Sequence, residues 1–248
     1  MVASSLKSKI NCIVLTYDRN RSLTDHMIDC YDYLWPNNPF LFHIPYQKLF
    51  GDEDNRIYVR SPESIKASVL LLIKNMDDND WVYWCIDDKY PIKLDIKTME
   101  IICNWISEES APEISGLLLC RARKLLETTN LTGKRIEIAG LSFLERKAYH
   151  QIWLHQFLRV KVIRSMFDKF PEVISKAKEM DAFKDAQSKD PSHKIYVIEK
   201  NKAIFGESSI GNKITANCLE SMKNKNIKIP KWFKVGLPNS VIIGTDDF

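Results

Sequence analysis

Two adjacent carboxylates, Asp87 and Asp88, follow a run of six mostly apolar residues, Trp81 to Ile86. A run of this length and composition is typical of a buried strand, and we expect Pro91 to end the regular structure soon afterwards. Carboxylates at the end of a buried strand are costly unless a counter-charge neutralises them, and a divalent cation usually does so. The pair therefore predicts a metal-assisted site, although a plain strand-end turn also favours Asp.

A second polar cluster follows the first predicted strand, which covers residues 10–16. It consists of Thr16, Tyr17, Asp18 and Arg19. In an α/β sheet the carboxyl ends of parallel strands meet at one edge, and ligands bind there. We therefore expect the cluster to lie beside the acidic pair and to share a binding site with it.

The elements that would position these residues alternate between strand and helix. Over the first half we expect strands at 10–16, 40–46, 57–60 and 81–86, with helices at 22–34 and 63–76. This alternation predicts an α/β fold with a mostly parallel, twisted sheet and helices on both faces. After Pro91 we expect helices at 96–107, 153–170 and 212–224, with a polar helix continuing past Pro171 to about residue 184. We also expect strands at 114–121 and 136–143 and a hairpin at 195–205.

Composition narrows the class of protein. The net charge is only +4, so we expect no nucleic-acid partner, because such partners usually require a clustered basic face. The six cysteines form no C-x-x-C pair and lie partly in apolar runs, which speaks against zinc and predicts a reducing, cytoplasmic location. With no run of about twenty apolar residues we expect no transmembrane segment, while contact with a membrane surface stays possible.

Several segments resemble, in order and spacing, the nucleotide-sugar glycosyltransferases of the GT-A fold over about the first 170 residues. The similar segments are Ile13 to Tyr17, Ser61 to Ile65, Trp84 to Tyr90 and Tyr149 to Trp153. The resemblance implies a GT-A-like fold and a metal-dependent hexosyltransferase-like enzyme of polysaccharide biosynthesis. Its donor would be a nucleotide-diphosphate sugar, and its acceptor a glycan or lipid-linked hydroxyl.

The same resemblance implies roles for particular residues. Asp88, with His193 as a late ligand, would hold Mn²⁺ or Mg²⁺ against the diphosphate. The other donor contacts would come from Thr16, Tyr17, Asp18, Arg19, Arg60, Ser64 and Asp87. The base that deprotonates the acceptor hydroxyl would be one of Glu145, Glu179 and Asp181, which are candidates by position only.

We expect a single domain over residues 1–248, with a nucleotide-sugar-binding half at 1–123 and an acceptor-side half at 124–248. Two other functions stay open. A divalent-metal-dependent nuclease or hydrolase could combine Asp87 and Asp88 with Glu199, although alternating charges on an exposed hairpin would also explain Glu199. A non-catalytic interaction protein could keep the same α/β scaffold.

Overall fold

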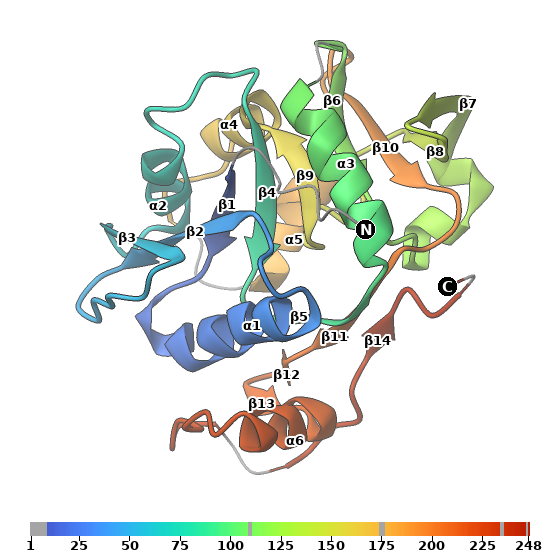
Figure 1. Ribbon diagram of the computed structural model, residues 1–248. Helices are drawn as coiled ribbons and strands as arrows, with labels where there is room; N and C mark the ends of the chain where they lie inside the picture. The colour runs from blue at the N-terminus through green and yellow to red at the C-terminus, as the bar shows by residue number, and fades with distance from the viewer. Residues whose placement is uncertain (1–8, 109–110, 174–176, 234–235, 247) are drawn as a thin grey trace.

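A nine-stranded sheet lies at the centre of the computed structural model, which describes residues 9–108, 111–173, 177–233, 236–246 and 248 (Figure 1). Its strand order is β3-β2-β1-β4-β9-β6-β10-β8-β7. The strands are β1 (Ile10–Leu15), β2 (Phe40–Tyr46), β3 (Arg56–Arg60), β4 (Trp81–Ile86), β6 (Ile114–Leu118), β7 (Leu131–Ile138), β8 (Leu141–Arg146), β9 (Gln156–Arg159) and β10 (Lys194–Ile198).

The sheet is mixed, but most of its strands share one direction. The four strands β3, β2, β1 and β4 are mutually parallel, and β6 is parallel to β10. Of the nine strands, only β8 and β9 run against the others. The predicted α/β fold with a mostly parallel sheet is confirmed, and the sheet draws strands from both halves of the chain.

Helices cover both faces of the sheet, as predicted. They are α1 (Arg21–Leu34), α2 (Ile65–Leu72), α3 (Ile96–Glu108), α4 (Val160–Asp168), α5 (Ala177–Ala186) and α6 (Ala216–Asn224). One hydrophobic core joins α1 and α3 to one face of the sheet and continues to α6, which lies beyond the strand ends (Figure 1). A second core joins α2, α4 and α5 to the other face. Successive side chains of β4 point to opposite faces of the sheet and so enter both cores: Tyr83 and Cys85 pack in the first, and Trp84 and Ile86 pack in the second.

Two small sheets extend the molecule beyond the ends of the central strands. The first contains β5 (Lys89–Leu94), β11 (Ala203–Glu207) and β14 (Ile242–Ile243), and the second pairs β12 (Ser209–Ile210) with β13 (Lys213–Ile214). In the described part of the chain, no helix is both long enough and apolar enough to cross a membrane.

Pro91 does not end the regular structure, contrary to the prediction. It lies inside β5, opposite Phe205 of β11, where the strand register shifts. Because proline lacks a backbone N–H, it is tolerated in a sheet at such an irregular position. The acidic pair is therefore the turn between a strand of the central sheet and a strand of the small one.

Three predictions for the second half were wrong. The predicted strand over 136–143 is a hairpin, because β7 turns at Ala139 and Gly140 into the antiparallel β8. The other two concern pairing between distant strands. Residues 156–159 of the predicted helix over 153–170 form β9 instead, whose Phe157 and Leu158 enter opposite cores between β4 and β6. The predicted hairpin over 195–205 is two strands of different sheets, because β10 pairs with β6 and β8 while β11 pairs with β5 and β14. In both places pairing with distant strands overrode the local sequence pattern.

Candidate functional site

The carboxyl ends of β1 and β4 meet at one edge of the sheet. Leu15 pairs with Ile86 in the parallel register, and the backbone N–H of Asp87 donates to the carbonyl of Leu15 at 3.3 Å. Thr16 follows β1 and is 8% exposed. The predicted meeting of the acidic pair with the end of the first strand is therefore present in the structure.

Asp87 is a buried carboxyl with few polar partners. Its side chain accepts a hydrogen bond from Asn20 Nδ2 at 2.9 Å, and the residue is 6% exposed. Burial raises the pKa of Asp87 from its usual 3.8 to about 7, the neighbouring charge of Asp88 adds to the rise, and hydrogen bonding to Thr16 and Asn20 opposes it. A positive charge bound beside Asp87 would relieve this cost.

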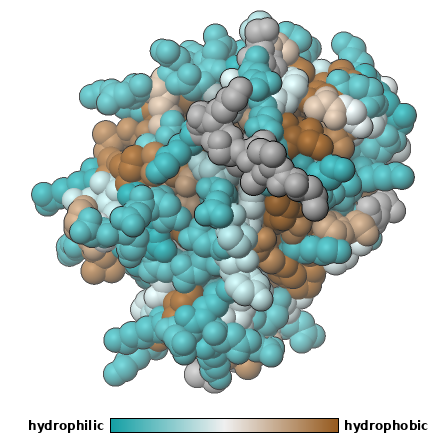
Figure 2. Space-filling model, in the orientation of Figure 1, coloured by the Kyte–Doolittle hydropathy of each residue, from teal (hydrophilic) through white to brown (hydrophobic). Residues whose placement is uncertain are grey.

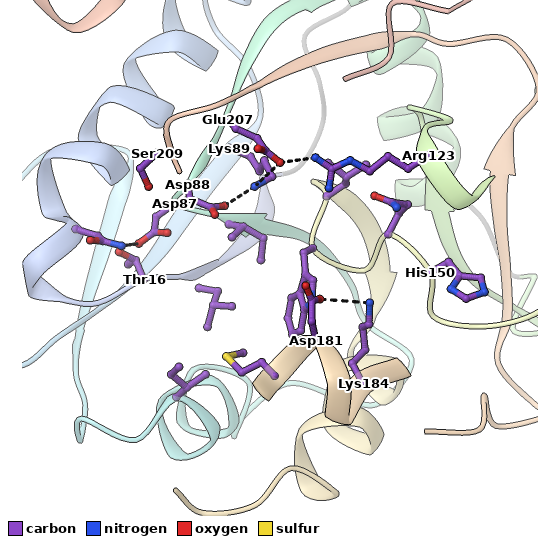
Figure 3. A pocket seen from close by; sticks show the side chains of 18 of the residues that line it. Thr16, Asp87, Asp88, Lys89, Arg123, His150, Asp181, Lys184, Glu207 and Ser209 are labelled. Carbon is purple, nitrogen blue, oxygen red and sulfur yellow. Dashed lines mark hydrogen bonds and ion pairs between the residues drawn. The ribbon is translucent and has the colours of Figure 1, made fainter. Parts of the chain in front are cut away.

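Asp88 begins a line of alternating charges. Lys89 Nζ lies 2.9 Å from Asp88 Oδ1 and 3.6 Å from Glu207 Oε1, and Arg123 Nη2 lies 2.6 Å from the same Glu207 oxygen (Figure 3). Lys89 and Glu207 face each other across β5 and β11. The backbone N–H of Ser208 donates to the carbonyl of Asp88 at 2.8 Å, which fixes the turn that carries the acids.

These residues line a cavity of about 550 Å³, which lies within the usual range for small-molecule sites. The near wall comes from the ends of β1, β4 and β11. The far wall comes from α5 and from the segment before β9. The lining residues used below are Thr16, Tyr17, Asn20, Asp87, Asp88, Lys89, Arg123, Lys124, His150, Gln151, Trp153, Asp181, Lys184 and Glu207.

The far wall presents an acid beside an aromatic ring. Asp181 accepts a hydrogen bond from Nε1 of Trp153 and pairs with Lys184 at 3.5 Å (Figure 3). The ring of Trp153 packs on Phe167 and Phe170, which fixes its position. An aromatic face next to a carboxylate can pack against a sugar ring and accept a hydrogen bond from its hydroxyl groups.

A buried guanidinium supports the segment before β9. Arg146 is fully buried and donates to the side chain of Gln156 at 2.8 Å and to the carbonyl of His150. Burial lowers the pKa of Arg146 to about 9. Burial, followed by the charge of Lys124, lowers the pKa of His150, so its imidazole is neutral at pH 7.

The structure brings together five of the residues assigned to the site from the sequence: Thr16, Tyr17, Asp87, Asp88 and Asp181. Tyr17 is 44% exposed at the cavity edge, and burial of the rest of its side chain, together with the charge of Asp87, raises the pKa of its phenol. Of the three proposed bases, only Asp181 lines the cavity.

Four of the predicted donor contacts have other positions. The carboxylate of Asp18 accepts backbone N–H groups of Gln47, Lys48 and Leu49, which closes the loop after β2. Ser64 caps α2 by accepting the N–H of Ala67 at 3.3 Å. The remaining two are Arg19, whose guanidinium stacks on Trp232 at 4.4 Å, and Arg60, which is exposed at the end of β3.

The other predicted site residues also lie outside the cavity lining. Glu145 is buried in β8, where it accepts a hydrogen bond from Thr132 at 2.8 Å. Glu179 is exposed on α5. His193 is buried before β10 and bonds through Nδ1 to the hydroxyl of Tyr149 at 2.8 Å. The structure therefore does not bring His193 to Asp88.

Glu199, the third acid of the nuclease alternative, follows β10. Its carboxylate pairs with Arg135 of β7 at 2.6 Å. The strands β9 and β6 lie between β10 and β4. The structure does not join Glu199 to the acidic pair.

Several cavity residues were not assigned to the site from the sequence: Asn20, Lys89, Arg123, His150, Trp153, Lys184 and Glu207. Of these, Lys89, His150 and Trp153 lie in segments that carry the resemblance. Lys89 could have been found, because it directly follows the acidic pair. Glu207 had no signal in the sequence, because it reaches the cavity through a strand pairing far along the chain.

A divalent cation fits this site only with help from a substrate. Among the described residues, no three His, Cys, Asp or Glu side chains gather closely enough to hold a metal ion. Asp87 and Asp88 supply two hard carboxylates, the donor type that Mg²⁺ and Mn²⁺ prefer. Phosphate oxygens and water would have to complete the coordination, as is usual for Mg²⁺ at substrate phosphates.

Comparison with protein-family models and with curated proteins finds no match. Solved structures give distant similarities. The 4-diphosphocytidyl-2C-methyl-D-erythritol synthase from Anaerococcus prevotii is 11% identical with a TM-score of 0.42, covering 88% of this chain and 96% of its own. The bifunctional IspDF from Campylobacter jejuni is 9% identical with a TM-score of 0.35, covering 78% of this chain; this chain spans 50% of its length.

A third similar structure is the galactosyltransferase LgtC in complex with donor and acceptor sugar analogues. It is 11% identical with a TM-score of 0.37, and the match covers 74% of this chain and 68% of LgtC. These are likenesses of fold at low identity.

Proposed function

We propose that the protein is a glycosyltransferase that moves a sugar from a nucleotide-diphosphate sugar to a hydroxyl of a glycan or lipid-linked acceptor. One observation carries the proposal. The acids at the end of a central strand and the polar residues at the end of its neighbour share one cavity, and a carboxylate lies on the opposite wall. The burial of Asp87 supports a functional site, because an unneutralised buried carboxyl lowers stability and is retained mainly where it has a use.

The donor would occupy the near wall. Thr16, Tyr17 and Asn20 would contact the nucleoside, since they line the cavity where β1 ends. Lys89 and Arg123 would face the diphosphate, and the planar guanidinium of Arg123 suits two phosphate oxygens at once. Both cations are already held in place by Glu207, so little side-chain entropy would be lost on binding.

Asp88 and Asp87 would hold Mn²⁺ or Mg²⁺ together with the phosphates of the donor. When bound, the cation would neutralise the charge that develops on the leaving diphosphate. Lys89 would keep Asp88 oriented through the oxygen that it binds at 2.9 Å. Ser208 would keep the backbone of Asp88 in place.

The acceptor would occupy the far wall, against Trp153. In an inverting reaction, the Asp181 carboxylate would take the proton of the acceptor hydroxyl as its oxygen forms the bond to the anomeric carbon. The bond from that carbon to the diphosphate breaks, and the nucleoside diphosphate leaves with the electron pair. The indole N–H of Trp153 would keep the carboxylate of Asp181 aimed at the acceptor.

Titration with nucleotide sugars tests this proposal most directly. The melting temperature is measured with UDP, GDP and CMP sugars, each with and without Mn²⁺ or Mg²⁺. Saturating donor should stabilise the fold by roughly 2–4 kcal/mol, because it binds the native state alone. If no nucleotide raises the melting temperature with either metal, the proposed function is wrong.

A further inference from the structure

A basic segment begins in the last turn of α6 and lies outside the candidate site. It covers residues 223–232 and contains Lys223, Lys225, Lys228 and Lys231. Three of these lysines are exposed and Lys225 is half-buried. No Asp or Glu occurs between Glu220 and Asp246 in the sequence, so this stretch carries positive charge without an acid of its own.

Apolar side chains accompany these lysines on the surface. Ile227, Ile229 and Trp232 of the basic segment are partly buried against the first core, which anchors the segment to the molecule. Tyr33 of α1 is 75% exposed, with Lys225 Nζ 4.3 Å from its ring centre. Leu237 is 49% exposed next to Pro238, whose carbonyl accepts the N–H of Ala216 at the start of α6. Figure 2 shows hydrophilic residues gathered over the end of the molecule that carries α6.

The basic segment is tied to the edge of the sheet where the cavity opens. Arg19, which follows β1, stacks on Trp232 at 4.4 Å. Thr215 at the start of α6 donates its N–H to the carbonyl of Ser208 at 3.0 Å, and Ser208 in turn donates to Asp88. A surface that binds the basic segment would therefore lie close to the cavity opening.

We propose that the basic segment, with Tyr33 and Leu237, binds the surface of a bilayer that contains anionic phospholipid. Lysines near such a surface are attracted by its negative potential, while Tyr and Leu side chains enter the interface between headgroups and acyl chains. The exposed apolar side chains favour a lipid surface over nucleic acid, whose backbone would engage the lysines alone. Where the proposed function also holds, this contact places the cavity beside a lipid-linked acceptor.

Electrostatic attraction sets how much affinity for an anionic bilayer the four lysines should contribute. One lysine near an anionic surface contributes about a five-fold gain in affinity, so four contribute up to about a thousand-fold. Asp29 of α1 lies close enough to influence Lys225, which lowers the contribution of that lysine. Raising the salt concentration should weaken the attraction, because the interaction takes place within a Debye length of the surface.

Vesicle co-sedimentation without nucleotide tests the proposal. The full chain is mixed with vesicles of phosphatidylcholine alone or of phosphatidylcholine with phosphatidylglycerol. We expect binding only to the anionic vesicles. The combined Lys223→Gln, Lys225→Gln, Lys228→Gln and Lys231→Gln variant should lose at least a hundred-fold in affinity at low salt.

A matched control replaces four exposed lysines on other elements: Lys74→Gln, Lys97→Gln, Lys134→Gln and Lys169→Gln. This control variant removes the same amount of positive charge, and its affinity for anionic vesicles should fall by no more than a few-fold. Tyr33→Ser with Leu237→Ser should weaken the binding that persists at high salt. Melting temperatures of all variants verify that they fold.

Equal losses in the two lysine variants would overturn the proposal, because binding would then follow net charge alone. Absence of binding to anionic vesicles would overturn it as well. So would a duplex DNA oligonucleotide that displaces the protein from vesicles while the Tyr33 and Leu237 changes have no effect, since that result assigns the segment to nucleic acid. None of these outcomes bears on the nucleotide titration, which tests the glycosyltransferase proposal separately.

Discussion

Asn20 donates a hydrogen bond from Nδ2 to Oδ2 of the buried Asp87 at 2.9 Å, which joins the start of α1 to the end of β4. The amide is a neutral partner and leaves the charge of the carboxylate uncompensated. Lys89 forms an ion pair with the adjacent Asp88, whereas its charge acts on Asp87 only from a longer distance and offsets little of the burial cost. The acidic pair thus consists of one acid with a cationic partner and one without, and the latter is the buried one.

The buried carboxyl makes stability depend on pH. Because the pKa of Asp87 is raised, the native state holds this proton more tightly than the unfolded chain, so stability falls as the pH rises from about 4 to about 7. Asp87→Asn should remove this loss and stabilise the metal-free protein by up to about 4 kcal/mol at pH 8. At pH 3.5 the gain should nearly vanish.

Urea unfolding of the parent protein and of the Asp87→Asn variant, at pH 8 and at pH 3.5, measures the difference in the free energy of unfolding. Asp52→Asn, at an exposed residue of the loop after β2, is the matched control and should change the free energy of unfolding by less than about 0.5 kcal/mol. A variant at position 87 that is less stable than the parent at pH 8 would contradict the assigned burial cost.

Asp88→Ala should abolish the part of nucleotide binding that depends on Mn²⁺ or Mg²⁺ while the fold stays intact. The side chain of Asp88 is 39% exposed, so its removal costs little packing. Calorimetric titration with nucleoside diphosphate, once with metal and once with chelator, separates the metal-dependent part of the binding from the metal-independent part. Asp54→Ala in an exposed loop is the control. Metal-dependent binding at the parent affinity would rule out the role of Asp88.

Asp181→Asn should lower kcat by about 10²–10⁴-fold, the usual contribution of a general base, and leave donor affinity unchanged. Asn preserves the shape of the side chain and can still accept from Trp153. Glu179→Gln, at an exposed acid on the same helix, should keep full activity. Initial rates at saturating donor and acceptor give the comparison, and equal rates in both variants would remove Asp181 from the mechanism.

Ser64→Ala tests whether this residue is a helix cap or a donor contact. Loss of the cap on α2 should cost about 1 kcal/mol of stability, whereas Ser64→Gly should cost only a few tenths. Neither change should alter the affinity for the nucleotide. A marked loss of nucleotide binding without loss of stability would return Ser64 to the site.

The sequence was sufficient for the part of the site that depends on regular strands. Residues 81–86 form a continuous apolar run, and such a run in a βα pattern has few alternatives to a central parallel strand. Parallel pairing then required Thr16 and Asp87 to meet at one edge. The far wall could not be predicted in the same way, because Asp181 reaches the cavity only through the packing of α5.

Short elements, and strand pairings between distant parts of the chain, account for the wrong secondary-structure predictions. Residues 156–159 also fit the helical spacing that α4 continues, so their local sequence does not specify a strand. They form a strand because they pair with β4 on one side and with β6 on the other. The net charge of the whole chain also gave no sign of the basic segment. A value of +4 for the whole chain conceals four lysines in nine residues, since acids elsewhere balance them.

The insertion of β9 between β4 and β6 has a consequence for synthesis of the chain. Until residue 159 has emerged from the ribosome, one edge of β4 has no partner, although its residues are among the most apolar in the protein. Unpaired apolar edges invite association between nascent chains. The nascent protein should therefore depend on chaperones until β9 closes the sheet, and a fragment that stops at residue 123 should aggregate rather than fold.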